Sequence, residues 1–159
     1  MDKDGENLEK VLDVGEVLSF CDASNKLAFT VDNGQRICVY SFEEEKIDTI
    51  IDFKEFGIPG FDWSIHGDWD TEGNRIAFTE NPSSFPESGE DTLALWVYDV
   101  DSDSLILRRF MEGQLPNDYA YHLRWQPYGR WIVFEDIYNI WRIRDDGEEL
   151  MKILPKEGR

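Results

Sequence analysis

Residues 125–134 read WQPYGRWIVF, and the same pattern occurs twice earlier in the chain, as WDTEGNRIAF at 69–78 and FCDASNKLAF at 20–29. In each copy the first aromatic residue precedes the last by nine positions, with a turn rich in Gly, Asp, Asn or Pro between them. Apolar runs on both sides of such a turn are typical of two strands joined in a hairpin. Because similar copies recur tens of residues apart, the sequence predicts a repeat architecture.

Each copy is followed by a further apolar strand that contains an aromatic-rich tetrad or its equivalent. These segments are ICVY at 37–40, LWVY at 95–98 and IWRI at 140–143. An acidic or glycine-containing turn comes next, and a fourth strand then opens at Ile47, Leu105 or Leu150. We therefore expect a single domain over residues 1–159, with four-stranded units at 15–52, 61–110 and 119–155.

The start of the chain matches the end of the last unit. Residues 4–12 read DGENLEKVL, and residues 146–154 read DGEELMKIL. The chain therefore begins inside a repeat, and residues 1–14 are expected to supply the last strand of a preceding unit. Thirteen strands and no long helix are predicted in all.

The three copies resemble the TolB-like β-propeller repeat, whose usual form is Trp-Ser-Pro-Asp-Gly-Lys-x-Ile-Ala-Phe followed by Ile-Trp-x-x-Asp-x-Asp-Gly. The third copy is the most similar, because it keeps Trp125, Pro127 and Gly129, whereas the first has Phe20 in place of Trp and Ser24 in place of Gly. The resemblance spans nearly the whole chain. It implies an all-β fold, a partial β-propeller of three four-stranded antiparallel blades plus an extra N-terminal strand.

The resemblance does not decide the function. This repeat occurs in periplasmic interaction proteins, in gating domains of prolyl-oligopeptidase-like peptidases and in proteins of no assigned role, so function has to be argued from a site.

Three blades leave a closure problem, because propellers typically need about four to eight blades around a channel. One hypothesis is a homodimer in which three plus three blades make a six-bladed ring. The alternative is that the chain is a piece of a longer propeller. In either arrangement the N-terminal strand has to add to a blade edge, displace its counterpart or pair in another subunit, and edge pairing is favoured.

The net charge disfavours several classes of partner. The chain has 16 Lys and Arg against 34 Asp and Glu, a net charge of -18, which disfavours nucleic acid and anionic membranes.

Cys21 and Cys38 can form one disulfide at most and are expected to be buried as small apolar residues. The acidic start is unlike a signal peptide, which favours a cytoplasmic location for the chain as it stands. A fragment of an exported protein would instead be periplasmic or extracellular.

The two histidines occupy the same phase of the repeat. His66 lies three residues before Trp69, and His122 lies three residues before Trp125. Because the first strand of a blade lines the channel, we expect His66 and His122 to converge on a ligand or metal, with Asp68 and Asp70 adding oxygen ligands. The alternative is that they share a phase by ancestry alone. No third ligand has supporting spacing, so neither a metal nor another cofactor is predicted.

Two further binding candidates lie outside the repeat pattern. Residues 81–91 lengthen the connection between the second and third strands of the middle blade, and Phe85 is the natural anchor of such a recognition loop. The alternative is a tolerated surface insertion. Trp63 has no repeat equivalent and is the least explained aromatic residue. The tryptophans in repeat phase are predicted to form core between blades rather than a stacking platform; they are Trp69, Trp96, Trp125, Trp131 and Trp141.

Motifs of nucleophilic, phosphate-binding and zinc-dependent enzymes are missing from the sequence, so no catalytic residue is predicted. The favoured function is a non-catalytic propeller segment that acts as a protein-interaction or scaffold module, binding a protein partner or itself. One alternative is a fragment of the gating propeller of a serine peptidase or related hydrolase. Another is a metal-assisted hydrolase that uses His66, His122 and neighbouring carboxylates.

Overall fold

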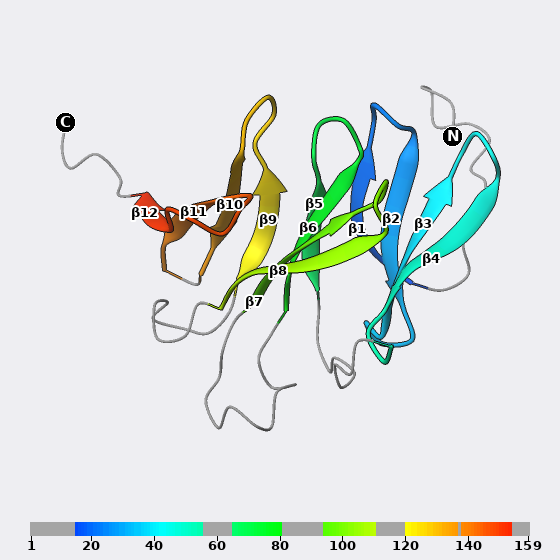
Figure 1. The fold of residues 1–159 in the computed structure, drawn as a ribbon, viewed down its shortest axis with the longest axis horizontal. Coiled ribbons are helices and arrows are strands. Elements are labelled where there is room, and N and C mark those ends of the chain that lie inside the picture. The colour runs from blue at the N-terminus through cyan, green and yellow to red at the C-terminus, as the bar shows by residue number, and fades with distance from the viewer. Residues whose placement is uncertain (1–14, 56–64, 81–93, 111–119, 137, 154–159) are drawn as a thin grey trace.

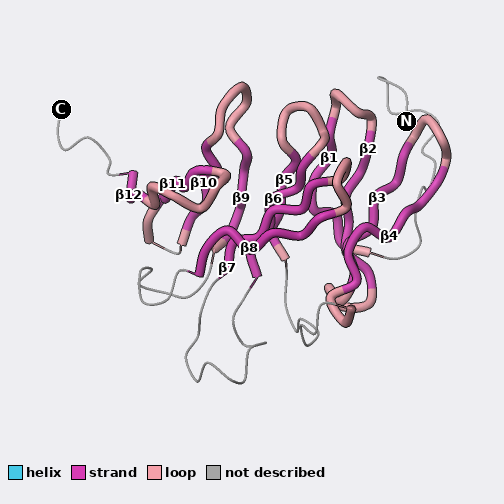
Figure 2. The backbone as a smooth tube through the Cα atoms, in the orientation of Figure 1, coloured by secondary structure: helices cyan, strands magenta, loops and turns pink. Residues whose placement is uncertain are grey.

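The computed structural model describes residues 15–55, 65–80, 94–110, 120–136 and 138–153. Within these ranges the chain forms twelve β-strands and no helix (Figures 1 and 2). The strands are β1 Glu16–Cys21, β2 Lys26–Val31, β3 Arg36–Ser41, β4 Lys46–Asp52, β5 His66–Trp69, β6 Arg75–Glu80, β7 Ala94–Asp99, β8 Ser104–Phe110, β9 Tyr121–Trp125, β10 Trp131–Glu135, β11 Ile140–Arg144 and β12 Met151–Ile153. The predicted leading strand at residues 1–14 lies outside the described residues.

The strands form the three expected four-stranded antiparallel sheets, in the orders β1-β2-β3-β4, β5-β6-β7-β8 and β9-β10-β11-β12. We call these sheets blade 1, blade 2 and blade 3. The prediction of three separate sheets rather than one continuous sheet is therefore confirmed. The last strand, β12, is three residues long and begins at Met151, one residue after the predicted opening at Leu150.

The blades pack in a row, with blade 2 between the other two (Figure 1). Their first strands, β1, β5 and β9, lie next to one another. Successive side chains of a strand point to opposite faces of its sheet, so the middle blade can fill two interfaces at once. Ile76 and Phe78 of β6 pack toward blade 1, and Ala77 between them packs toward blade 3.

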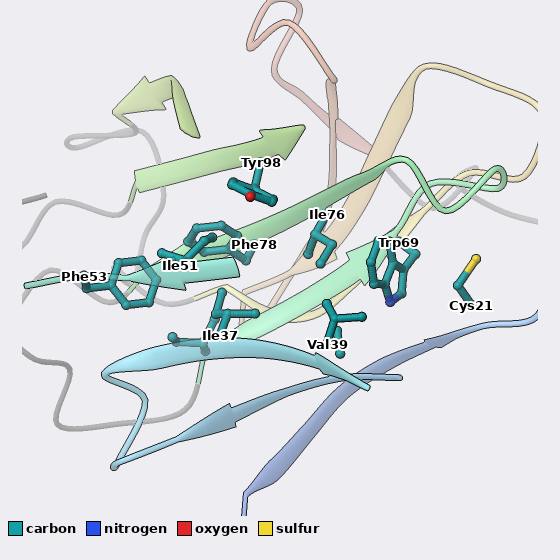
Figure 3. Packing of buried hydrophobic residues seen from close by; sticks show 11 residues of the cluster. Cys21, Ile37, Val39, Ile51, Phe53, Trp69, Ile76, Phe78 and Tyr98 are labelled. Carbon is teal, nitrogen blue, oxygen red and sulfur yellow. The ribbon is translucent and has the colours of Figure 1, made fainter. Parts of the chain in front are cut away.

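The two layers between the blades are the hydrophobic core. Figure 3 shows the first layer, in which Trp69, Ile76 and Phe78 of blade 2 face Ile37 and Val39 of blade 1. The second layer joins blade 2 to blade 3 through buried side chains such as Leu95, Trp125 and Phe134. Because each interface is built from fully buried apolar groups, burial of these side chains is the main force that holds the blades together.

A tight turn also packs against the neighbouring blade. Gly73 ends the first turn of blade 2 with φ of 75°, a conformation that favours glycine. A Cβ atom at Gly73 would meet the Sγ atom of Cys21 at 2.8 Å and would clash with the hydroxyl of Ser24. Glycine is therefore required here both for the turn and for the close approach of blade 1.

The prediction for the repeat tryptophans is confirmed at four positions. Trp69 and Trp125 are buried between blades, and Trp96 and Trp141 pack partly buried against the same clusters. The prediction is wrong for Trp131, which belongs to neither cluster. Its ring lies 4.3 Å from the guanidinium carbon of Arg142 instead. Trp131 pairs with Arg144 and lies one strand position from Ile132, which faces blade 2, so its side chain points to the other face.

Cys21 and Cys38 are both buried free thiols, as the sequence indicated. The described part of the chain has no helix that is long and apolar enough to cross a membrane.

Candidate functional site

The structure brings the two histidines together at the beginning of the first strands of blades 2 and 3. His66 is the first residue of β5, and His122 is the second residue of the neighbouring strand β9. Their ring centroids lie 6.1 Å apart. The ring of Tyr121 meets that of His66 edge to face, with centroids 5.4 Å apart. Equivalent positions of two blades thus converge, while binding of a ligand there stays a prediction.

An irregularity in β9 directs His122 outward. The pairing of β9 with β10 shifts between Val133 and Glu135, as it does in a β-bulge, and His122 has φ of 50°. The exposed imidazole then lies with Nδ1 2.5 Å from Oε1 of Glu135. Glu135 comes directly after the last aromatic residue of the third repeat copy. The sequence did not predict it as a site residue, because its carboxylate comes near His122 only through the bulge.

The two imidazoles have different surroundings. His66 is half-buried, and this burial, followed by the nearby charge of His122, lowers the pKa of His66 from its ordinary 6.5. Glu16 opposes the shift. The neutral form of His66 is therefore favoured at neutral pH, and a neutral imidazole offers one donor and one acceptor nitrogen.

Asp68 occupies a joint between the blades. Its Oδ1 accepts a short hydrogen bond from the hydroxyl of Ser19 in β1, and its Oδ2 accepts one from the backbone N–H of Trp125 in β9 at 2.9 Å. One carboxylate on β5 thus connects the first strands of all three blades. This joint accounts for an Asp in the inner strand, and a role of Asp68 in binding a ligand stays a prediction.

A metal centre is not formed by the described residues. Among them there is no group of three or more His, Cys, Asp or Glu side chains that could hold a metal ion. His66 and His122 therefore converge without the third ligand that a protein metal site ordinarily requires. Trp63 and Phe85, the other two predicted binding residues, lie outside the described ranges.

At the opposite end of the strands, a charged network joins blade 2 to blade 3. Arg75 donates from Nε to Asp70 at 3.0 Å and from Nη1 to Asp145 at 2.8 Å. Its guanidinium carbon also lies 4.7 Å from the ring centroid of Trp125. Arg130 contacts the second oxygen of Asp145 at 2.7 Å. Both aspartates are buried, and their pairing with arginines offsets the cost of removing their charges from water.

Part of the outer side of blade 1 is open, whereas Phe29 and Cys38 on the same side are buried. Phe20 is 48% exposed and Ile47 is 50% exposed, and Val17 is also exposed. The ring of Phe42 meets those of Phe20 and Tyr40 edge to face, with centroids 5.9 Å and 4.9 Å away. We call Val17, Phe20, Leu27, Tyr40, Phe42 and Ile47 the open face of blade 1. Clustered apolar side chains of this kind mark interaction surfaces more often than scattered ones do.

No protein-family model matches the sequence, and no curated protein matches it. Solved structures do match the fold. TolB from Acinetobacter baumannii has a TM-score of 0.67 and 17% identity, over 98% of this chain and 36% of that chain. Oligogalacturonate lyase in complex with manganese has a TM-score of 0.60 and 14% identity, over 84% of this chain and 38% of that one. Acylaminoacyl peptidase from Pyrococcus horikoshii has a TM-score of 0.58 and 14% identity, over 90% and 25%.

These similarities establish the fold and no more, because the identities are low. The chain is an all-β partial propeller of three blades, and it spans between a quarter and two fifths of the length of each of these structures.

Proposed function

We propose that this propeller segment works by binding, as a non-catalytic interaction or scaffold module whose partner is another protein or a second copy of itself. The observation that carries the proposal is the open face of blade 1. Exposed aromatic residues that touch one another, as Phe20 and Phe42 do, are typical of the centre of a protein interface. They are costly to leave in water, which favours their burial against a partner.

The repeat supports the same proposal. In blade 2 the residues equivalent to Phe20 and Tyr40 are Trp69 and Tyr98, and both of these are buried against blade 1. The open face therefore has the composition of an interface between blades. The end of the inner strands that carries His66 and His122 is proposed as a second contact surface, because it presents an exposed imidazole beside a carboxylate.

A second candidate is part of the gating propeller of a serine peptidase or related hydrolase. The similarity to the peptidase from Pyrococcus horikoshii favours it at the level of the fold. A hydrolase domain encoded in continuous frame with this chain would decide for this candidate. Membership of the TolB-like repeat family is likewise proposed, on the repeat motifs and the similarity to TolB.

Site-specific photo-crosslinking tests the binding function. A benzophenone amino acid replaces Phe20 on the open face, and in a control it replaces Tyr128, which is 95% exposed in a turn. After irradiation of intact cells that make the protein, we expect a discrete adduct from position 20 and none of the same mass from position 128. A chain that gives no protein adduct at position 20, including adducts with itself, would contradict the proposal.

A further inference from the structure

Equivalent residues of blades 1 and 2 identify the surface with which blade 1 would receive a preceding blade. In blade 2, Trp69, Ile76 and Tyr98 pack against the preceding blade. Their equivalents in blade 1 are Phe20, Leu27 and Tyr40. Phe20 pairs with Leu27, and Leu27 pairs with Tyr40, so these three side chains share one face of blade 1. The neighbouring Ala28 and Val39 face blade 2, so the shared face is the opposite one, the open face. Blade 1 thus keeps three of the side chains that receive a preceding blade, while Phe29, the equivalent of Phe78 on the same face, is already buried.

Blade 3 presents the complementary side. The residues with which blade 2 receives the following blade include Ala77 and Val97. Their equivalents in blade 3 are Val133 and Arg142, which pair with each other on the face turned away from blade 2. Ile140, Met151 and Ile153 are exposed there as well. We call this surface the open face of blade 3.

The existing joint between blades 2 and 3 shows how the two open faces match. There the guanidinium of Arg75 lies over the ring of Trp125. In the repeat, Trp131 occupies the position of Arg75, and Phe20 occupies the position of Trp125. A joint of the same kind would set the Trp131 and Arg142 pair against the aromatic residues of the open face of blade 1. A cation would again meet an aromatic ring, now with the guanidinium supplied by Arg142.

Charge favours the same match. Arg124 is paired with Val133 and so lies on the open face of blade 3 beside Arg142. The open face of blade 1 carries Phe42, which is followed directly by the acidic turn at residues 43–45. The face of blade 3 also carries Glu135 and that of blade 1 also carries Arg36, but these two contact His122 and Asp32. Arg124 and Arg142 on one face are therefore left to complement the glutamates beside the other. Two blade 1 faces in mutual contact would leave the arginines without this complement.

We propose that the open face of blade 1 binds the open face of blade 3 of a second copy, so that two chains close one ring of six blades. The proposal rests on the binding function above and gives it a partner. The two joints of such a ring are identical, because a twofold axis relates the two copies, and each removes one pair of open faces from water.

Sedimentation velocity of the purified full chain tests the proposal, with one variant on each face. Phe20→Lys places a cation opposite Arg142, and Arg142→Glu places an acid beside aromatic residues and the acidic turn. The matched controls are Tyr128→Lys and Lys54→Glu, which make the same changes of charge at exposed turn positions outside both faces. Ile47→Lys is a second variant of the blade 1 face. Circular dichroism verifies that each variant is folded.

The expected wild-type species is a dimer of the 18.6 kDa chain. We expect both face variants to raise the dissociation constant at least about 30-fold, as loss of a central interface residue does, and the controls to leave it unchanged. Mixing Phe20→Lys with Arg142→Glu should restore the dimer, because the mixed ring has one unaltered joint and one with opposite charges.

Three results would overturn the proposal. They are a wild-type monomer at all micromolar concentrations, a dimer broken by Phe20→Lys and untouched by Arg142→Glu, and open chains longer than a dimer. The second result would indicate that blade 1 faces pair with each other. A monomer that still gives a crosslink from position 20 to another protein would refute the ring and leave the binding function standing.

Discussion

Removal of the Asp68 carboxylate should weaken all three blades together. The side chain accepts hydrogen bonds from Ser19 in blade 1 and from the backbone of Trp125 in blade 3, while it belongs to blade 2 itself. In Asp68→Ala both donors lose their acceptor at once. The change therefore measures how strongly the first strands are held together.

The magnitude follows from the two bonds. A hydrogen bond to a charged group contributes about 1.5–3 kcal/mol, and the lower end applies because Asp68 is only partly buried. Asp68→Ala should thus cost about 3 kcal/mol of unfolding free energy, which lowers Tm by about 6–12 °C in a domain of this size. Asp68→Asn should cost about 1 kcal/mol, because the amide can accept from Trp125 and donate to the hydroxyl of Ser19.

Thermal unfolding followed by circular dichroism, at one fixed protein concentration, gives these differences. Ser19→Ala and the double variant Ser19→Ala/Asp68→Ala complete a cycle, in which we expect a coupling energy of about 1 kcal/mol. Asp48→Ala is the matched control, because Asp48 is an exposed carboxylate whose partner is the exposed Lys46. It should leave Tm unchanged.

The joint at Asp68 fails as a source of stability if Asp68→Ala unfolds within about 1 °C of the wild type, since two lost charged hydrogen bonds must appear in Tm. It also fails if Asp68→Asn is as unstable as Asp68→Ala, because the charge alone would then matter and the bonding geometry would not.

Three other perturbations address the core and the titrating groups. Phe78→Ala empties a fully buried position between blades 1 and 2 and should lower the free energy of unfolding by about 3–5 kcal/mol in chemical denaturation. Phe78→Leu should lower it clearly less, and equal losses in the two variants would refute tight packing there. Burial opposes ionisation of Asp136, but hydrogen bonds from Asn139, Trp141 and Tyr138 outweigh it and lower its pKa from 3.8. The ionised carboxylate therefore stabilises the fold above pH 3.8 and loses this effect as acid protonates it. The difference in unfolding free energy between wild type and Asp136→Asn should shrink below pH 3.8. A difference that stays constant with pH would contradict this role of the carboxylate. In NMR titration His66 should show a pKa below 6.5 that rises when His122 becomes Ala, and an unchanged value in that variant would exclude the charge of His122 as a cause.

The repeat was readable from the sequence because its determinants are local. Each copy places apolar residues on both sides of a turn, and the same nine-residue spacing returns at Phe20, Trp69 and Trp125. Such a pattern predicts hairpins, and three copies predict three sheets that stack. The mutual approach of His66 and His122 followed from the same phase, because equivalent residues of adjacent blades are neighbours in space.

Other features depend on contacts between distant segments and had no local signal. The bulge that directs His122 toward Glu135 arises from a shift in pairing within blade 3, which the residue types do not encode. The bridge from Arg75 to Asp145 joins residues 70 positions apart. Trp131 occupies the repeat position of Lys26 and Arg75, one residue before the buried Ile132, so it lies on the other side of its strand. Its aromatic type suggested core, although its position in the repeat did not.

The alternation along β6, with Ile76 and Phe78 on one side and Ala77 on the other, makes blade 2 a shared wall of both core layers. In a single chain outside the proposed ring, either end blade can open by giving up one layer, whereas the middle blade opens only when both layers are lost. Unfolding should consequently advance inward from the two ends, and backbone amides of β6 should be the last to exchange their hydrogens with solvent.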